Sequence, residues 1–564
     1  MGKRAAVLII TAGVLLAGCT TPAPGPAATA TTAQVALEPT PTPQPTNTPA
    51  PSPTPTISPA QEGCVRATAE IPEGQNPTRY VTSGPASGCY HGVGDFLEDI
   101  GFSWGDFTPG TVITFWTQWP VDSEGIVIPP TPTPIPISVT ISPSMEDGFE
   151  YVCGHPPFTV DFSAQVSGGR GDLQYAWDFN VDGNVDATVQ DPEPFTYQTP
   201  GVYNAIITVS DSAGQTAVSE RRVVVIGAPT WPGWRYGVMA HVDLGHKQYA
   251  NMDEVNRALS MISGAGIQAV RVDFAWGAME PARSRFDWRD YDEMVAALKA
   301  HNLGVLALVG WTPYWATSVS DPEQAWNNPP TDVRDYARFV HTVVSRYHDS
   351  VRAWEFWGEP NISIYWKPRP DPIRFAEMQR LGYLAAKYAD PTSVILFTGL
   401  ANDESQYMPQ HIWYAPEQFL QTVYDQIGNA YFDVVGRHPY THPTWQGWDV
   451  FLGRVQAMRN VMVANGDSAK PLWIDEVGYG LIGGLTEEGQ AQWLTQILTH
   501  MLSAADYDFV SWYNFRNKVR EEYGYEPGTD SYIQEHTMGL VREDFSPKPA
   551  YYAYQEFIRQ HPSP

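Results

Sequence analysis

Cysteine and basic residues are scarce in this sequence. Four cysteines among 564 residues are too few for a disulfide scaffold. Only 34 lysine and arginine residues stand against 62 aspartate and glutamate residues, which gives a formal net charge of -28. Because no basic field is available to attract phosphate groups, no nucleic acid or anionic membrane surface is expected as a partner. Solubility is the simplest explanation of the acidic excess.

Motifs of several enzyme classes are also missing. No Gly-rich phosphate loop, dinucleotide fingerprint or Gly-x-Ser-x-Gly elbow is present. His438 and His442 lie four residues apart, but Pro439 and Pro443 exclude the helix that a zinc-binding pair of this spacing requires. These absences argue against nucleotide-dependent and serine-dependent chemistry, and the spacing of the two histidines is accidental.

The first residues carry an export pattern. Lys3 and Arg4 precede an apolar run over residues 5–17 that is too short to span a bilayer comfortably, and the run is followed by Gly18 and Cys19. Residues 1–19 resemble a bacterial lipoprotein signal peptide with Cys19 as the lipidated residue, and an ordinary secretory signal is the alternative. The resemblance implies an extracellular protein that is attached to the cell membrane only through its lipid anchor, or is secreted.

Two linkers rich in Pro and Thr follow. Residues 20–60 and 129–136 cannot bury a core and favour extended polyproline geometry, so they act as spacers. Between them, residues 61–128 form a small module of unknown role, part of which faintly resembles a peptidoglycan-binding lysin motif. Cys64 and Cys89 could form a bridge there in an exported protein.

Residues 137–227 have the pattern of a β-sandwich. Alternating runs such as 202–209 are separated by Gly and Asp turns. The stretches 175–179, 195–197 and 200–203 resemble the polycystic kidney disease (PKD) domain, an immunoglobulin-like unit common in secreted bacterial hydrolases. Within this unit a free, inert thiol is expected at the cysteine that lacks an evident partner, Cys153.

Oxygen-bearing side chains alternate along one stretch of the sandwich. Calcium prefers such ligands, but the bidentate Glu of an EF-hand is missing. A solvated Asx-rich hairpin turn explains the stretch equally well. The possible structural calcium ligands are Asp178, Asn180, Asp182, Asn184 and Asp186.

From residue 231 to 564, short apolar runs alternate with helical patterns. Eight candidate strands with helices between them predict a (β/α)₈ barrel, the TIM barrel fold. A doubly wound open sheet is the rival, but no phosphate loop follows any strand. The candidate strands are 236–241, 269–274, 305–309, 351–357, 394–398, 434–438, 472–476 and 509–513.

Two of these strands end in a carboxylate. Glu359 follows one apolar run and precedes Pro360, which cannot continue a central strand. Glu476 closes the seventh candidate strand. A parallel barrel keeps its chemistry at the carboxyl ends of its strands. Glycoside hydrolysis needs two carboxyl groups there, one as acid and base and one as nucleophile.

Further strand ends carry polar or aromatic residues that core packing would not select. Each alone has a structural explanation, such as a buried ion pair between Arg271 and Asp273 or a tryptophan packed at the barrel rim. Together, at successive strand ends, they converge on one face. These residues are Arg271, Trp311, Trp315, His438, Tyr440 and Trp512.

In their order, these motifs resemble clan A of the glycoside hydrolases, nearest to family 39-like and cellulase-like barrels. The stretches that carry the resemblance include 270–273, 311–313, 354–361, 438–440 and 473–476. The resemblance implies a retaining double displacement by the two glutamates at the strand ends. It also implies that no cofactor is required for catalysis.

Roles follow from the resemblance residue by residue. Glu359 is expected to be the acid/base and Glu476 the nucleophile, supported by Arg271 and Tyr440. His438 is expected to line the same pocket. Flat faces for sugar rings are expected from tryptophans, notably Trp357, Trp366, Trp445 and Trp512, with rim packing as the alternative.

One position departs from the family pattern. Gly358 stands where members usually have an Asn that donates to the sugar 2-hydroxyl group, a contact that strengthens in the transition state. Three explanations are open. Asn361 or a loop residue takes the role, the substrate lacks a free 2-hydroxyl group, or catalysis is weak.

The sequence therefore predicts an exported, retaining glycoside hydrolase acting on a β-linked polysaccharide or oligosaccharide outside the cell. A β-xylosidase-like exo enzyme and a transglycosylase are alternatives within this class. A non-catalytic glycan-binding surface lipoprotein with a degenerate pocket is the alternative from another class, and Gly358 is the residue that favours it. The oligomeric state does not follow from the sequence.

Overall fold

A computed structural model describes residues 136–142, 151–243, 248–403, 410–504, 506–518 and 527–563, together with the backbone of three earlier strands. These are β1 (Val65–Glu70), β2 (Tyr80–Val81) and β3 (Val112–Thr117), which form an antiparallel sheet in the order β2-β1-β3. The predicted signal peptide with Cys19, the first linker and the Cys64–Cys89 pair lie outside the described residues. Among the residues that are described, no helix is long and apolar enough to cross a membrane.

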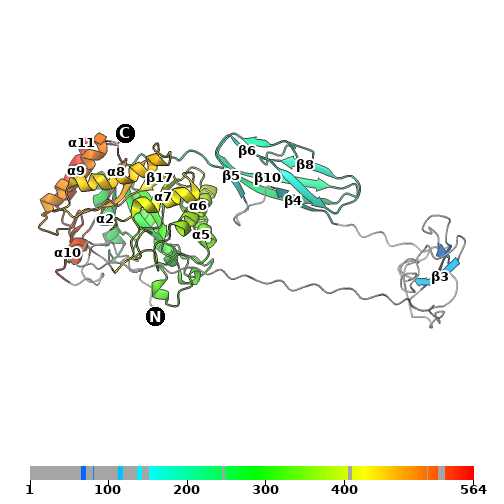
Figure 1. The fold of residues 1–564 in the computed structure, drawn as a ribbon, viewed down its shortest axis with the longest axis horizontal. Helices are drawn as coiled ribbons and strands as arrows, with labels where there is room; N and C mark the ends of the chain where they lie inside the picture. Colours follow the sequence, from blue (N-terminus) through cyan, green and yellow to red (C-terminus); the bar gives the residue numbers. More distant parts are fainter. Residues whose placement is uncertain are drawn as a thin grey trace, which may run out of the picture.

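The predicted β-sandwich is confirmed (Figure 1). Its larger sheet has the order β5-β11-β10-β8, and two strand pairs, β4 with β7 and β6 with β9, complete it. Trp177 is fully buried at the centre of the core, where it packs against Phe162 and Phe179. The strands are β4 (Ser138–Ser142), β5 (Tyr151–Gly154), β6 (Phe158–Val160), β7 (Ser163–Ser167), β8 (Gln174–Asp178), β9 (Phe195–Tyr197), β10 (Gly201–Ser210) and β11 (Thr216–Val225).

The acidic stretch of the sandwich forms a turn after β8. The Asp178 carboxylate accepts hydrogen bonds from the backbone N–H groups of Asn180, Asp182 and Gly183. The Asp186 carboxylate accepts one from Phe179. These are the hydrogen bonds of an Asx-rich turn, and the calcium site stays a prediction.

Cys153 lies where the sandwich meets the barrel. Its thiol is free, as predicted, and burial raises its pKa to about 11, so it stays protonated. Val224 and Ile226 at the end of the sandwich belong to the barrel's apolar core. The backbone N–H of Gly227 donates to the carbonyl of Pro391, at the start of a barrel strand. The sandwich therefore contacts the amino-terminal end of the barrel strands.

Eight parallel strands close into a barrel in chain order, β12 to β19, which confirms the predicted fold class. Every candidate strand of the sequence corresponds to one of them, and nearly every strand residue is buried because helices cover the outside. The strands are β12 (Tyr236–Met239), β13 (Ala269–Ala275), β14 (Gly304–Gly310), β15 (Ala353–Phe356), β16 (Val394–Phe397), β17 (Val434–Gly436), β18 (Leu472–Val477) and β19 (Phe509–Tyr513).

The helices around the barrel follow the apolar periodicity of the sequence. In the first of them, Val255, Ala258, Leu259 and Ile262 are the buried face, and Asn251 caps the amino terminus by accepting the N–H of Glu254. The helices are α2 (Met252–Gly264), α3 (Trp276–Met279), α4 (Arg289–Ala300), α5 (Val333–Tyr347), α6 (Pro372–Ala389), α7 (Pro416–Ile427), α8 (Trp448–Ala464), α9 (Glu487–Ala504), α10 (Asp530–Thr537) and α11 (Pro549–Gln560).

Candidate active site

A small pocket, with a cavity volume of about 20 Å³, opens at the carboxyl ends of the barrel strands. This is the end opposite the contact with the sandwich, so the sandwich leaves the pocket uncovered. Its walls include side chains from β13, from the segment after β15 and from β18. Among the lining residues are Arg271, Asp273, Trp311, Glu359, His438 and Glu476.

The two candidate catalytic glutamates face each other across this pocket. One carboxyl oxygen of Glu359, one ring nitrogen of His438 and one carboxyl oxygen of Glu476 all lie within 4.8 Å of one another. Retaining glycosidases place their two carboxyl groups about 5–5.5 Å apart. The spacing of Glu359 and Glu476 is therefore compatible with a retaining pair.

Glu359 reaches the pocket on a constrained backbone. Its φ angle is +45°, and Trp357 and Trp311 have φ angles of +69° and +68°. Residues other than glycine rarely have φ angles in this left-handed region, and those that do concentrate at functional sites. The tight turn after β15 is what aims the carboxyl group of Glu359 across the barrel opening.

Glu476 is held by two donors. Nη1 of Arg271 donates to one carboxylate oxygen at 2.6 Å, and the hydroxyl of Tyr440 donates to the other at 2.9 Å. Burial raises the pKa of Glu476, while the positive charges of His438 and Arg271 and the Tyr440 hydrogen bond act against it. These donors favour the anionic form that a nucleophile needs.

Glu359 has a different environment. Its Oε1 lies 2.7 Å from Nδ1 of His438. Its Oε2 is buried and has no hydrogen-bond partner among the described residues. Since Glu359 lines the pocket, Oε2 is the oxygen left to contact a ligand. An unpaired buried carboxyl oxygen is costly unless a ligand satisfies it.

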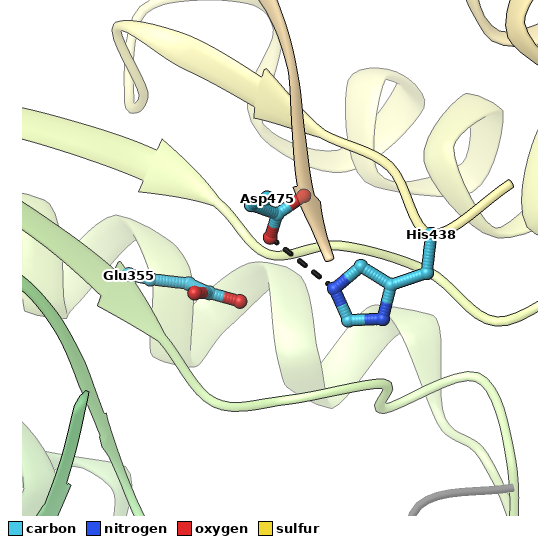
Figure 2. Close-up of side chains that lie close together, drawn as sticks. All are labelled: Glu355, His438 and Asp475. Atoms are coloured by element: carbon cyan, nitrogen blue, oxygen red, sulfur yellow. Dashed lines mark hydrogen bonds and ion pairs between the residues drawn. The ribbon is translucent and has the colours of Figure 1, made fainter. Parts of the chain in front are cut away.

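A second layer of charge lies beneath the pocket. Glu355 in β15 accepts hydrogen bonds from Nε and Nη2 of Arg271, at 2.7 and 2.9 Å. Asp475 in β18 lies 3.3 Å from Nε2 of His438 (Figure 2). The suggested ion pair between Arg271 and Asp273 is wrong, because Arg271 bonds Glu355 and Glu476 instead. Asp273 accepts a hydrogen bond from the indole of Trp311 at 3.0 Å.

Glu355 and Asp475 were not singled out from the sequence. Their signal was present: each is a charged residue within a buried strand, with apolar neighbours on both sides of Glu355 and, for Asp475, an apolar run before it and Glu476 after it. A carboxylate at such a position requires a partner of opposite charge. The sequence does not say which partner it meets, because the partners come from distant strands.

Two groups of three side chains have the composition of a metal site, Glu355–His438–Asp475 and Glu359–His438–Glu476. Both depend on His438. The neighbouring Glu476 and Asp475 carboxylates raise the pKa of His438 well above its usual value despite burial. A protonated imidazole donates from both nitrogens and has no lone pair for a metal. The chemistry of these groups therefore favours charge pairing over metal binding.

Asn361 lies outside the pocket. Its amide donates to the backbone carbonyls of Ala401 and Tyr414, at 2.8 and 3.0 Å, and its oxygen accepts the N–H of Ala401. The side chain is fully buried. The expected substrate contact of Asn361 is corrected accordingly: its polar atoms are used to fix the loops at the pocket's outer edge, so it cannot replace the missing Asn.

Three of the expected aromatic platforms are core residues. Trp357, Trp366 and Trp512 are buried, and the indole N–H groups of Trp357 and Trp512 donate to the backbone carbonyls of Tyr365 and Met538. Rim packing, the alternative considered for them, is what the structure shows. Trp445 is 45% exposed and stacks on His442, away from the pocket lining.

The aromatic residues that do line the pocket are Trp311, Tyr365 and Tyr513. The last two were missed because they lie in a loop and at the end of β19, without a motif. The side chain of Trp311 also borders the space beside Gly358. A Cβ atom at Gly358 would lie 3.2 Å from Cδ1 of Leu308 and 3.4 Å from Cη2 of Trp311. The volume that an Asn side chain would take is therefore filled by neighbouring apolar groups.

Two parts of the chain, the sandwich and the first part of the barrel, match known family models. Residues 142–226 match the family model described as "PKD domain". Residues 246–348, which include α2 to α5, match the family model described as "Beta-galactosidase". These matches support the clan A resemblance seen in the sequence.

Individual relatives are more distant. The chain is 27% identical over 163 residues to beta-galactosidase Bga of Halorubrum lacusprofundi, a stretch that is 24% of this chain and 22% of that protein. It is similar to a family 39 glycoside hydrolase from Bacteroides cellulosilyticus WH2, with 21% identity and a TM-score of 0.45 over 72% of this chain and 81% of the other. A β-xylosidase from Caulobacter crescentus CB15 has 16% identity and a TM-score of 0.45, with coverages of 58% and 69%.

Proposed function

We propose that the barrel is a retaining glycoside hydrolase that cleaves a β-linked polysaccharide or oligosaccharide. The observation that carries the proposal is the placement of Glu359 and Glu476 within 4.8 Å of each other in one pocket. Two carboxyl groups at this distance leave no room for a water molecule behind the sugar. Direct attack by one of them is then the favoured first step.

In that step Glu476 attacks the anomeric carbon and forms a glycosyl ester. Arg271 and Tyr440 keep the carboxylate ionised and aimed before the attack. Glu359 gives its proton to the leaving oxygen through Oε2, the carboxyl oxygen without a protein partner. In the second step Glu359 takes a proton from water, and the water oxygen releases the sugar from Glu476.

Aromatic side chains suit the pocket to a sugar at the reacting position. The pocket is bounded by Trp311, Tyr365 and Tyr513, whose rings can contact the C–H faces of a pyranose. Because the matched family model and the curated relative are both described as β-galactosidases, aryl β-galactosides are the first substrates to test. Aryl β-xylosides test the exo alternative.

Export belongs to the same proposal. The signal-like residues 1–19 and the linker 20–60 suggest an enzyme that is anchored through Cys19 outside the cell and held away from the membrane. Labelling with a radioactive fatty acid, compared between the natural chain and Cys19→Ala, tests the anchor. An equal label in both would refute it.

A structural calcium ion in the sandwich is proposed on the oxygen-rich turn after β8. Asp178 and Asp186 already direct their carboxylates inward to backbone N–H groups, and a calcium ion would compete with these contacts. Bound calcium would raise the melting temperature of the sandwich relative to protein in a chelator. An unchanged melting temperature would refute the calcium site and show that this stretch is an Asx-rich turn without a bound ion.

A non-catalytic glycan binder is the second candidate, and Gly358 is the observation that favours it. Without the Asn, no side chain at this position donates to the sugar 2-hydroxyl group, and Trp311 fills the space. Such a protein would bind glycans without releasing product.

Hydrolysis by the full chain of a panel of aryl β-glycosides and β-glycans separates the two candidates. The enzyme proposal predicts release of product by the natural protein and its loss in Glu476→Gln, with glycan binding retained. Glu280→Gln is the matched control, because Glu280 is a buried carboxylate paired with Arg338 outside the pocket. Equal absence of hydrolysis in all three proteins, with binding intact, would support the binder.

A further inference from the structure

The six buried ionisable groups of the site form one connected cluster. Arg271 bridges Glu476 and Glu355, through bonds of 2.6 to 2.9 Å. His438 bridges Glu359 and Asp475, at 2.7 and 3.3 Å. The two halves meet at Glu355 and Asp475, whose nearest oxygens lie within 4.8 Å of each other and of His438 (Figure 2).

The charges of this cluster do not balance unless protons are added. Two cations, Arg271 and His438, face four carboxyl groups. All six side chains are at most 8% exposed, so water screens little of the imbalance. The cluster is neutral when two carboxyl groups carry a proton. The proposed reaction needs one of these protons on Glu359, and the second needs another site.

Glu355 is the carboxyl group suited to the second proton. Burial, with a contribution from the negative charge of Asp475, raises the pKa of Glu355 to about 7 although Arg271 opposes the shift. The charge of His438 and its hydrogen bond lower the pKa of Asp475 to about 2, against the effect of burial. Asp475 also accepts backbone N–H bonds from Arg437 and Gly399, which favour its anion. At rest the proton therefore belongs on Glu355.

We propose that Glu355 and Asp475 share one exchangeable proton, whose position follows the negative charge as it passes from Glu476 to Glu359 during the reaction. The inference rests on the proposed glycosidase function. It makes Glu355 and Asp475 positioning residues: neither lines the pocket, and both act through Arg271 and His438.

The charges beside Arg271 and His438 in each step of the reaction explain the role of Glu355 and Asp475. In the first step Glu359 loses its proton to the leaving oxygen and becomes an anion, while Glu476 forms an ester and loses its charge. Arg271 then has no anion beside it, and His438 has two. Transfer of the proton from Glu355 to Asp475 gives each cation one anion again. Hydrolysis of the ester reverses the transfer, so no co-reactant is consumed.

Other groups around Glu355 do not compete for this proton. The hydroxyl of Thr398, after β16, donates to Oε1 of Glu355 at 3.0 Å. Burial and the negative charge of Glu355 both raise the pKa of Tyr336 of α5 well above its usual value, so Tyr336 stays neutral. The charged groups that face Glu355 from the packed strands are Arg271 on β13, His438 after β17, and Asp475 on β18.

Infrared spectroscopy of the full chain tests the proposal, because a protonated carboxyl group absorbs separately from an ionised one. In the free enzyme we expect a protonated-carboxyl band that disappears with a midpoint near pH 7. Because protonated Glu359 contributes a carboxyl band of its own, Glu355→Gln should lose only the component that titrates near pH 7, whereas Glu280→Gln should keep both components. Should Glu355→Gln fail to fold, Glu359→Gln with carbon-13 in its glutamate side chains removes the other protonated glutamate of the cluster and assigns the remaining band near pH 7 to Glu355.

A second measurement follows the proton during the reaction. An activated 2-deoxy-2-fluoro glycoside of a sugar that the enzyme hydrolyses is used to trap the ester on Glu476, and mass spectrometry verifies it. With carbon-13 in the aspartate side chains, the trapped enzyme should show a protonated-carboxyl band that shifts with the label, as the free enzyme does not. A purely structural role for Glu355 would not move this band.

The outcomes separate the inference from the function. Absence of any trapped ester refutes the proposed glycosidase, whereas the titration of the free enzyme still tests Glu355. A trapped ester without a label-sensitive aspartate band, or a Glu355→Gln variant that keeps the band titrating near pH 7, overturns the shared proton.

Discussion

Tyr440→Phe gives the sharpest test of how the protein prepares Glu476. The substitution removes one hydroxyl group that donates to Oε1 of Glu476 at 2.9 Å and leaves the ring in place. A hydrogen bond to a charged group contributes about 1.5–3 kcal/mol. Since 1.36 kcal/mol corresponds to a factor of ten in rate, kcat/KM should fall by about 10- to 100-fold.

The substitution should also shift the pH dependence of kcat/KM in a definite direction. The Tyr440 hydrogen bond lowers the pKa of Glu476, so its removal raises that pKa. Glu476 must be ionised to attack, and its titration defines the acidic limb of the kcat/KM profile. The acidic limb of Tyr440→Phe should therefore move to higher pH, and the loss of activity should be greatest at low pH.

Tyr479→Phe is the matched control for this experiment. Tyr479 is also buried, and its hydroxyl contacts Thr441 at 2.9 Å rather than either glutamate. Its replacement should leave the acidic limb unmoved. Equal kcat/KM values and equal acidic limbs for the two variants would refute the assignment of Tyr440 as a donor that prepares the nucleophile.

Three further outcomes are expected. Gly358→Asn should lower the free energy of unfolding by about 1–3 kcal/mol in urea denaturation, without raising kcat/KM, because its Cβ would lie 3.2 Å from Leu308; a gain in activity would show that Trp311 makes way. Arg271→Met should lower the free energy of unfolding by about 3–5 kcal/mol, because it leaves buried carboxylates unpaired, and a stability equal to the natural protein would contradict the ion pairs. Asp332→Ala should cost about 1 kcal/mol in thermal unfolding without changing kcat, since Asp332 caps α5 and does not line the pocket.

The barrel could be predicted from the sequence because its signals are local. All eight strands correspond to short apolar runs, and the buried face of α2 consists of residues at helical spacing. Side-chain burial on one face decides both patterns. The positions of Glu359 and Glu476 at strand ends also follow from the chain alone, because parallel strands that close a barrel bring their carboxyl ends together.

Partners and exposure could not be predicted, because they depend on contacts between strands far apart in the chain. From the sequence, Arg271 has a nearby candidate partner in Asp273, yet the barrel places Glu355 and Glu476 against its guanidinium. Trp311, Trp357 and Trp512 all lie at or near the ends of predicted strands, so the sequence does not distinguish them. Of the three, only Trp311 lines the pocket.

The sequence by itself determined the sandwich, the barrel and the two facing glutamates, since hydrophobic periodicity and strand order are properties of the chain. Only the tertiary structure decided the buried charge cluster beneath them. Its members come from four different strand ends, and an ion pair in a low-dielectric interior is set by distances of a few ångströms that no local pattern encodes.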